Sequence, residues 1–205
     1  MHVKPQVIEA PTMRARKWLR IVRAAIIAVM FIVFILAGYA FYTVENDNFH
    51  TVASGHAYRS AQMTEDELAR CIEKYRIKSI LNLRGGNSST SWYQGEVAVA
   101  ARMEVTHYDE RLNSGNELTV KQMTDLIELL RRAPKPILIH CEAGADRTGL
   151  VSALYCLGLE GKSAEESGEQ LSVWYGHVPL IRPAVCAMDR SFIRYAAILS
   201  NQTNQ

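Results

Sequence analysis

A cysteine and an arginine stand close together in the segment HCEAGADRTG, which runs from His140 to Gly149. Cys141 supplies a thiol, and the thiolate is the reactive nucleophile in cysteine chemistry. Arg147 supplies a planar guanidinium group, whose parallel N–H groups can bind two oxygens of one phosphate. The pair therefore predicts attack by sulfur on a phosphorus atom that the arginine holds in place.

The surroundings of this segment predict a loop between a strand and a helix. Residues 137–140 form a short apolar run that follows Pro134 and Pro136, which is typical of a strand bounded by a turn. Backbone N–H groups in a tight turn and at a helix N-terminus bind anions without a metal, and they favour an ionised thiol. We therefore expect a phosphate-binding loop that needs no metal or other cofactor, made of Glu142, Ala143, Gly144, Ala145, Asp146 and Arg147.

These residues resemble the signature of the protein tyrosine phosphatase superfamily, a Cys and an Arg separated by five residues and followed by Ser or Thr and then Gly. The loop is most similar to the dual-specificity branch, which includes lipid phosphatases. The runs YRSAQ at 58–62 and NLR at 82–84 resemble bacterial members. The resemblance covers roughly Tyr58 to Tyr195. It implies a cysteine-dependent phosphatase in which Thr148 donates a hydrogen bond to the Cys141 sulfur.

Release of the product alcohol or phenol needs a proton donor, and four carboxylates near the loop are candidates: Asp109, Glu110, Glu142 and Asp146. Asp109 follows a predicted strand and stands 32 positions before Cys141. Dual-specificity phosphatases resemble this in placing their acid about that far upstream. Asp146 is the alternative, because some bacterial relatives carry an aspartate directly before the loop arginine. We favour Asp109, and the alternative stays open at this point.

The expected reaction is hydrolysis of a phosphate monoester through a cysteinyl-phosphate intermediate. Glu142 and Asp146 disfavour highly anionic ligands, so we expect a singly phosphorylated substrate. The resemblance implies phosphotyrosine, phosphoserine or phosphothreonine on a protein. A lipid phosphate of the cell envelope and a catalytically inactive phosphate-binding module are the alternatives. The net charge of +2, without a long basic run, argues against a nucleic-acid partner.

Apolar runs alternate with helical patterns after residue 49, which predicts an α/β fold with a central, mostly parallel sheet flanked by helices. Three pairs of residues are spaced as helix capping boxes: Thr64 with Glu67, Thr119 with Gln122 and Ser163 with Glu166. We expect strands over residues 78–83, 105–108 and 137–140. We expect helices over residues 64–75, 92–103, 119–132 and 187–199, and another helix after Ser163.

An uncharged apolar stretch over residues 24–44 follows six basic residues: Lys4, Arg14, Arg16, Lys17, Arg20 and Arg23. Its length suits a helix that crosses the roughly 30 Å hydrocarbon layer of a bilayer. We therefore expect a basic cytosolic N-terminus over 1–23, a single transmembrane helix over 24–44, a linker over 45–57 and a phosphatase domain over 58–200. The charge asymmetry places the catalytic domain in the periplasm. A cleaved signal peptide, processed near Gly38, is the alternative.

Overall fold

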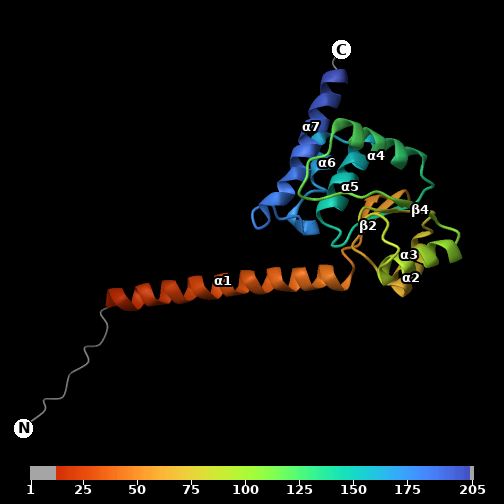
Figure 1. Cartoon of the computed structure of the whole chain (residues 1–205). Helices are drawn as coiled ribbons and strands as arrows, with labels where there is room; N and C mark the ends of the chain where they lie inside the picture. Colours follow the sequence, from red (N-terminus) through yellow and green to blue (C-terminus); the bar gives the residue numbers. More distant parts are fainter. Residues whose placement is uncertain (1–12, 204–205) are drawn as a thin grey trace, which may run out of the picture. The chain divides into compact units, whose positions relative to one another are not determined.

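The computed structural model describes residues 13–203, apart from the side chains at 13–16, 19, 36–37, 40–45, 202 and 203. The chain divides into two compact units between Tyr42 and Thr43. The first contains most of helix α1 (Met13–Glu45), and the second contains the sheet and the other helices (Figure 1). Residues 1–12, which belong to the predicted basic N-terminus, lie outside the described residues.

Helix α1 includes the stretch 24–44 for which we expected a membrane span. Its described apolar side chains are exposed all round the helix, and Phe34 is 75% exposed. Among the residues that the structure describes, no helix meets both the length and the apolarity needed to cross a membrane.

The second unit is built on a five-stranded sheet with the order β1-β2-β5-β3-β4. Its strands are β1 (His50–Ala53), β2 (Ala57–Ser60), β3 (Ser79–Asn82), β4 (Thr106–Asp109) and β5 (Ile137–His140). Only the β1–β2 pair is antiparallel, and β2, β5, β3 and β4 run parallel to one another. This confirms the predicted α/β fold with a mostly parallel sheet.

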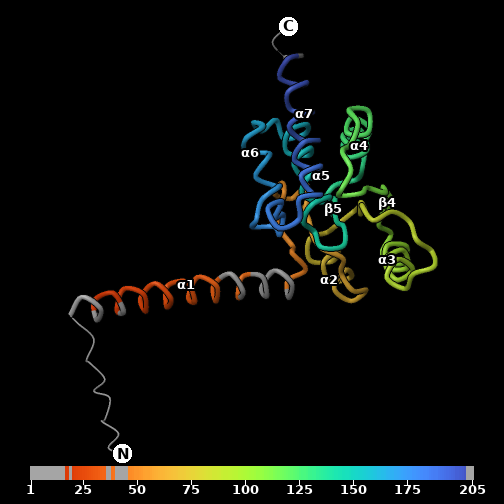
Figure 2. Tube along the Cα trace, turned by 60° about the vertical axis from the view of Figure 1, so that its left-hand side comes forward, coloured from red at the N-terminus to blue at the C-terminus, as the bar shows by residue number. Residues whose placement is uncertain are grey.

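Helices cover both faces of this sheet (Figure 1). Helices α2 (Glu65–Tyr75) and α3 (Ser91–Arg102) lie on one face. On the other face, α5 (Asp146–Gly158) lies against the sheet, and α4 (Val120–Arg132), α6 (Ala164–Gly168) and α7 (Cys186–Thr203) pack around α5 (Figure 2). Each face of the sheet has its own hydrophobic core, and successive strand residues point into the two cores alternately. Leu138 packs toward α2 and α3, whereas Ile137 and Ile139 pack toward α4 and α5.

Local sequence signals account for where several helices begin. Thr64, Thr119 and Ser163 each accept a hydrogen bond from the backbone N–H three residues on, and the expected capping boxes are present at all three helices. Helix α6, the third of them, is only five residues long. Residues 45–57, which we expected as a linker, contain β1 and the first residue of β2. Sheet pairing thus begins before residue 58, through a turn at Gly55.

The strand register brings four polar residues to one edge of the sheet. His140 pairs with Ser60 on one side and with Asn82 on the other, and Asn82 pairs with Asp109. These residues end their strands, so the carboxyl ends of all four parallel strands lie side by side. In open α/β sheets this edge is where ligands bind.

Candidate active site

The segment Cys141–Ala145 joins β5 to α5, and its carbonyl groups are bonded to residues outside the loop. The carbonyl oxygen of Glu142 accepts a hydrogen bond from the backbone N–H of Gln62 at 3.1 Å. The carbonyl oxygen of Ala143 accepts from Asn48 Nδ2 at 3.0 Å, and that of Gly144 accepts from Arg59 Nη2 at 2.8 Å. A planar trans peptide group points its N–H away from its C=O. The N–H groups of the residues that follow each carbonyl therefore face the opposite side of the loop, where they can bind an anion.

Gly144 allows the loop to turn so tightly. Its φ is +68°, a left-handed conformation that other residues rarely adopt. A Cβ atom at this position would lie 2.6 Å from the backbone nitrogen of Ala61 and 2.6 Å from the carbonyl carbon of Ser60. The loop therefore packs directly against the chain that leaves β2, and it has no room for a side chain.

Arg59 supports the loop from inside the domain. Its side chain is fully buried, and besides Gly144 it donates to the carbonyl oxygen and to Oε1 of Gln170, both at 2.8 Å. Its guanidinium also stacks over the ring of Tyr175, 4.0 Å from the centroid. Burial lowers the pKa of Arg59 to about 10, while the nearby Tyr175 and Cys141 side chains act in the opposite direction. Arg59 therefore keeps its positive charge at neutral pH, directly behind the loop.

Three predicted catalytic residues lie at the two ends of the loop. Cys141 is a free thiol, only 2% exposed, at the end of β5. Arg147, in the first turn of α5, is half-buried and donates to the carbonyl oxygen of Leu83 at 3.4 Å. Thr148 is fully buried, and its hydroxyl has no hydrogen-bond partner among the described residues. The predicted bond from Thr148 to the Cys141 sulfur is not among the hydrogen bonds of the structure.

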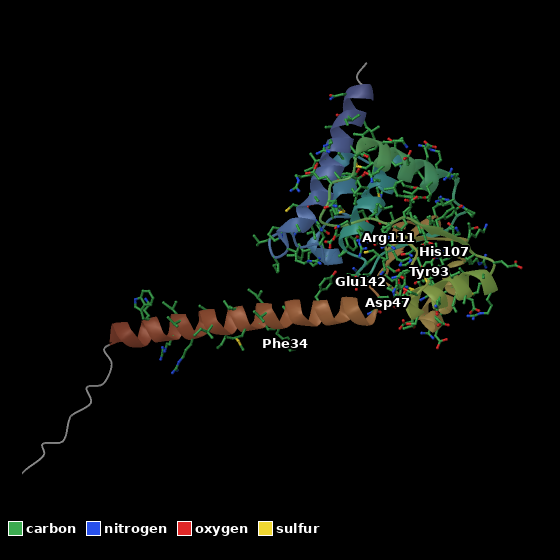
Figure 3. All side chains as sticks on the ribbon, in the orientation of Figure 1. Phe34, Asp47, Tyr93, His107, Arg111 and Glu142 are labelled. Atoms are coloured by element: carbon green, nitrogen blue, oxygen red, sulfur yellow. The ribbon has the colours of Figure 1, made fainter. Side chains whose placement is uncertain are left out.

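Asp109 lies at the same edge, at the end of β4. Its carboxylate accepts hydrogen bonds from Asn82 Nδ2 at 2.8 Å and from the Tyr93 hydroxyl at 2.5 Å. His107 lies next to Asp109 and Tyr93. Its Nδ1 is 3.8 Å from Asp109 Oδ2, and its ring is in edge contact with the ring of Tyr93 (Figure 3). The hydrogen bond to Asp109 raises the pKa of Tyr93 to about 12. The carboxylate of Asp109 is thus held by neighbours but stays partly open to solvent.

Asp146, the alternative acid, is the first residue of α5, and its side chain is buried. It accepts a 2.7 Å hydrogen bond from His177 Nδ1, and Arg182 Nη2 lies 3.0 Å from its other oxygen. His177 in turn contacts Asp189 through Nε2 at 3.0 Å. Both oxygens of Asp146 are therefore engaged in a structural network. The backbone N–H of Asp146 directly follows the loop and remains available to bind phosphate with the N–H groups of the loop.

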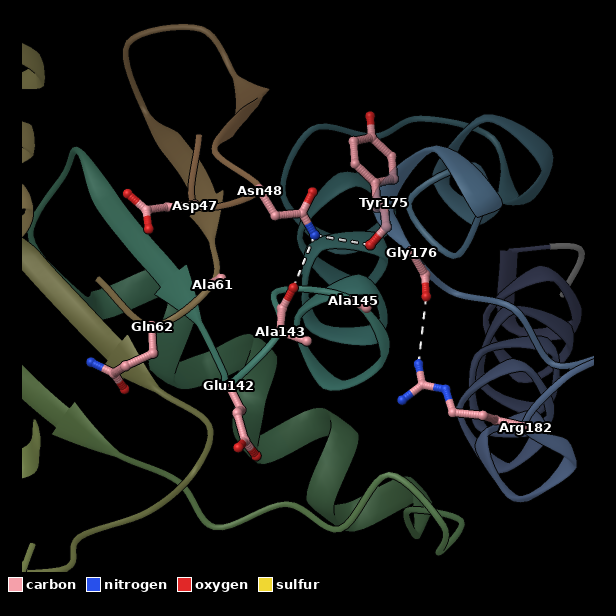
Figure 4. A pocket seen from close by; sticks show the side chains of 10 residues that line it. All are labelled: Asp47, Asn48, Ala61, Gln62, Glu142, Ala143, Ala145, Tyr175, Gly176 and Arg182. Atoms are coloured by element: carbon pink, nitrogen blue, oxygen red, sulfur yellow. Dashed lines mark hydrogen bonds between the residues drawn. The ribbon is translucent and has the colours of Figure 1, made fainter. Parts of the chain in front are cut away.

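A cavity of about 420 Å³ opens beside the loop. Glu142, Ala143 and Ala145 line it, as do Asp47, Tyr175 and the two residues Asn48 and Gln62 that bond to the loop carbonyl groups (Figure 4). Cys141 and Arg147 are not among its lining residues. Burial, followed by the negative charge of Glu67, raises the pKa of Asp47 to about 6. The acidic residues that line the cavity are Asp47 and Glu142, and Arg182 is its basic lining residue. Among the described residues, no group of three or more His, Cys, Asp or Glu side chains is placed to hold a metal ion.

Three side chains that contact the site were not predicted from the sequence. Arg59 was noted only as part of a family-like run, although an arginine inside a strand is itself a signal of a buried polar contact. Glu96 on α3 and His107 on β4 carried no motif at all. Arg84, the last residue of the family-like run NLR, stacks its guanidinium over Trp92 at 3.7 Å from the ring centroid.

Comparison with solved structures places this fold among known phosphatases. TpbA of P. aeruginosa superposes with a TM-score of 0.56 at 17% identity, over 76% of this chain and 92% of TpbA. The catalytic core of the PP-IP phosphatase SIW14 of S. cerevisiae gives 0.55 at 22% identity, over 75% and 93%. PTPMT1 gives 0.54 at 15% identity, over 75% and 99%. At these identities the likeness concerns the fold alone.

A search of curated proteins found no match. The profile of the tyrosine phosphatase family, in contrast, matches residues 37–165. This range includes the whole segment from β1 to α5 and therefore Asp109, Cys141 and Arg147. The chain belongs to the tyrosine phosphatase family and is a cysteine-dependent phosphatase.

Proposed function

We propose that this protein hydrolyses singly phosphorylated monoesters through a cysteinyl-phosphate formed on Cys141. The observation that carries the proposal is the orientation of the loop between β5 and α5. Its carbonyl groups bond outward to Gln62, Asn48 and Arg59. Its N–H groups and Arg147 are left to surround a phosphate directly above the buried sulfur.

The reaction proceeds in two displacements. The Cys141 sulfur forms a bond to phosphorus while the bond to the leaving oxygen breaks in line, and Asp109 gives that oxygen its proton. Water then attacks the phosphorus of the cysteinyl-phosphate, Asp109 takes a proton from this water, and the sulfur leaves as a thiolate. The buried, unpartnered Thr148 hydroxyl is available to donate a hydrogen bond to the departing sulfur.

The exposed Glu142 of the loop supports a singly phosphorylated substrate. Its carboxylate repels further phosphate groups beside the one bound in the loop. Phosphotyrosine, phosphoserine or phosphothreonine on a protein is the substrate class we propose. TpbA, whose fold this chain shares, has been crystallised with phosphotyrosine. A lipid phosphate of the cell envelope is the alternative.

Release of phosphate from three substrates tests this proposal. We expect turnover of a phosphotyrosine peptide and of para-nitrophenyl phosphate, and little turnover of an inositol polyphosphate. Cys141→Ser should abolish all activity. Glu142→Lys should raise the relative rate on the inositol polyphosphate. A phosphatidylinositol monophosphate that is hydrolysed faster than the peptide would favour the lipid alternative. If the wild-type protein binds phosphate but hydrolyses none of the three substrates, it is a phosphate-binding module.

We further propose that the stretch 24–44 holds the protein at a membrane, with its N-terminus in the cytosol and the catalytic domain in the periplasm. The charge asymmetry of the sequence and the exposed apolar side chains from Ile26 to Ile35 support this, since a helix that is apolar all round needs apolar surroundings. Membrane fractionation of the full chain against residues 46–205 tests the attachment. Fusions of the C-terminus to reporters active only inside or only outside the cytosol test the orientation.

A further inference from the structure

A buried glutamate on α3 contacts each of the segments that form the site. Glu96 is 3% exposed, and its carboxylate accepts from Gln62 Nε2 at 2.6 Å and from His107 Nε2 at 2.7 Å. His140 Nε2 lies 3.2 Å from the same carboxylate. Glu96 thus contacts three side chains from three parts of the sheet edge: Gln62 in the segment that follows β2, His107 within β4, and His140 at the end of β5.

Each of these partners adjoins a catalytic group. His140 directly precedes Cys141. His107 stands two residues before Asp109, with Nδ1 3.8 Å from the carboxylate of that residue. The backbone N–H of Gln62 bonds to the carbonyl oxygen of Glu142 in the phosphate-binding loop. The one carboxylate therefore connects the nucleophile, the loop and the acid.

The charge of Glu96 is costly in this position. Burying a carboxylate is unfavourable unless hydrogen bonds compensate, and an apolar side chain of similar volume would fill the core without that cost. Burial alone would raise the pKa of Glu96, but the hydrogen bonds from His107, His140 and Gln62 outweigh it and hold the pKa well below its ordinary value. Glu96 is therefore ionised at neutral pH. It accepts hydrogen bonds from Gln62 and His107, and His140 Nε2, which has no hydrogen-bond partner among the described residues, lies 3.2 Å from its carboxylate.

We propose that Glu96 is a positioning residue that couples the acid to the nucleophilic loop. It fixes the rings of His107 and His140, and through them it fixes Asp109 relative to Cys141. This inference rests on the proposed function, because it assigns Glu96 a task in that reaction. Displacement of an acid by about 1 Å is enough to cost on the order of 100-fold in rate.

The dependence of the rate on the leaving group separates this task from a purely structural one. Phenyl phosphate has a poor leaving group and needs the acid, whereas para-nitrophenyl phosphate needs it much less. We expect Glu96→Gln to lower kcat for phenyl phosphate by roughly 10- to 100-fold, with a far smaller fall for para-nitrophenyl phosphate and an unchanged KM. His107→Gln, which changes only the contact between Glu96 and Asp109, should show the same pattern. Glu73→Gln, at an exposed position on α2, is the matched control.

A double-mutant cycle gives the decisive result. In an Asp109→Asn background, Glu96→Gln should cost less than about twofold in kcat for phenyl phosphate, because the acid that it positions is already gone. Equal losses on both substrates, or full additivity with Asp109→Asn, would overturn the proposal. Neither result would touch the proposed function, which fails only if the wild type is inactive or if Cys141→Ser keeps its activity.

Discussion

At the scale of single residues, two aspartates compete for the role of general acid, and their surroundings differ. Asp146 has both oxygens engaged by His177 and Arg182 inside the domain. Asp109 is held by Asn82 and Tyr93 and remains partly exposed at the edge where the substrate binds. A proton donor must reach the leaving oxygen, which favours Asp109.

We therefore predict that Asp109→Asn lowers kcat for phenyl phosphate by roughly 100- to 10,000-fold and lowers kcat for para-nitrophenyl phosphate much less. Asp146→Asn should instead lower stability and leave the ratio of the two rates unchanged. Steady-state kinetics with both substrates measures this. If Asp146→Asn removed the leaving-group dependence and Asp109→Asn did not, the assignment of the acid would be reversed.

Gly144 tests the geometry of the loop. We predict that Gly144→Ala lowers kcat/KM by at least roughly 100-fold, because its Cβ would push the loop N–H groups away from the phosphate. Gly161→Ala is the matched control: its φ is +65°, but nothing lies within 4 Å of the added Cβ. It should cost about 1 kcal/mol in unfolding free energy and leave the activity intact. Similar activity losses in both variants would contradict this view of the loop.

At the scale of elements, helix α5 is fixed at its first turn by the buried contacts of His177 with Asp146 and Asp189. Burial alone would lower the pKa of His177, but the hydrogen bonds to the two aspartates outweigh it and raise the pKa above its ordinary value of 6.5. The stabilisation from protonated His177 is therefore complete below about pH 6.5 and is lost as the pH rises through the raised pKa.

We predict that His177→Gln lowers the unfolding free energy by about 2 kcal/mol at pH 6 and by clearly less at pH 9. Urea unfolding of the wild type and the variant at several pH values measures the difference. A loss that stays constant from pH 6 to pH 9 would mean that protonation of His177 does not stabilise the fold.

The elements themselves were largely predictable, because their signals are local. The strand 137–140 was placed to the residue, and the capping boxes at Thr64 and Thr119 fixed the starts of α2 and α4. The β1–β2 hairpin was missed. Its strands are four residues long, and part of their stability comes from pairing with β5, far along the sequence.

At the scale of the whole molecule, the sequence indicates the candidate reactive residues but not the residues that hold them in place. Cys141 and Arg147 lie in one contiguous motif, so they can be identified without knowledge of the fold. The support comes from contacts across the chain: Arg59 bonds to Gln170, 111 positions away, and to the carbonyl of Gly144. The strand register that aligns Ser60, His140, Asn82 and Asp109 brings such distant residues together. No local pattern encodes this alignment.

The central claim is that phosphate passes through a covalent bond to one sulfur, and acid quenching tests it most directly. The full chain is mixed with a phosphotyrosine peptide that carries radiolabelled phosphate, quenched in acid within one turnover and mapped by peptide analysis. We predict labelled phosphate on the peptide that contains Cys141, and neither label nor phosphate release in Cys141→Ala. Phosphate release by the wild type without any labelled chain, or release by Cys141→Ala at the normal rate, would contradict the account.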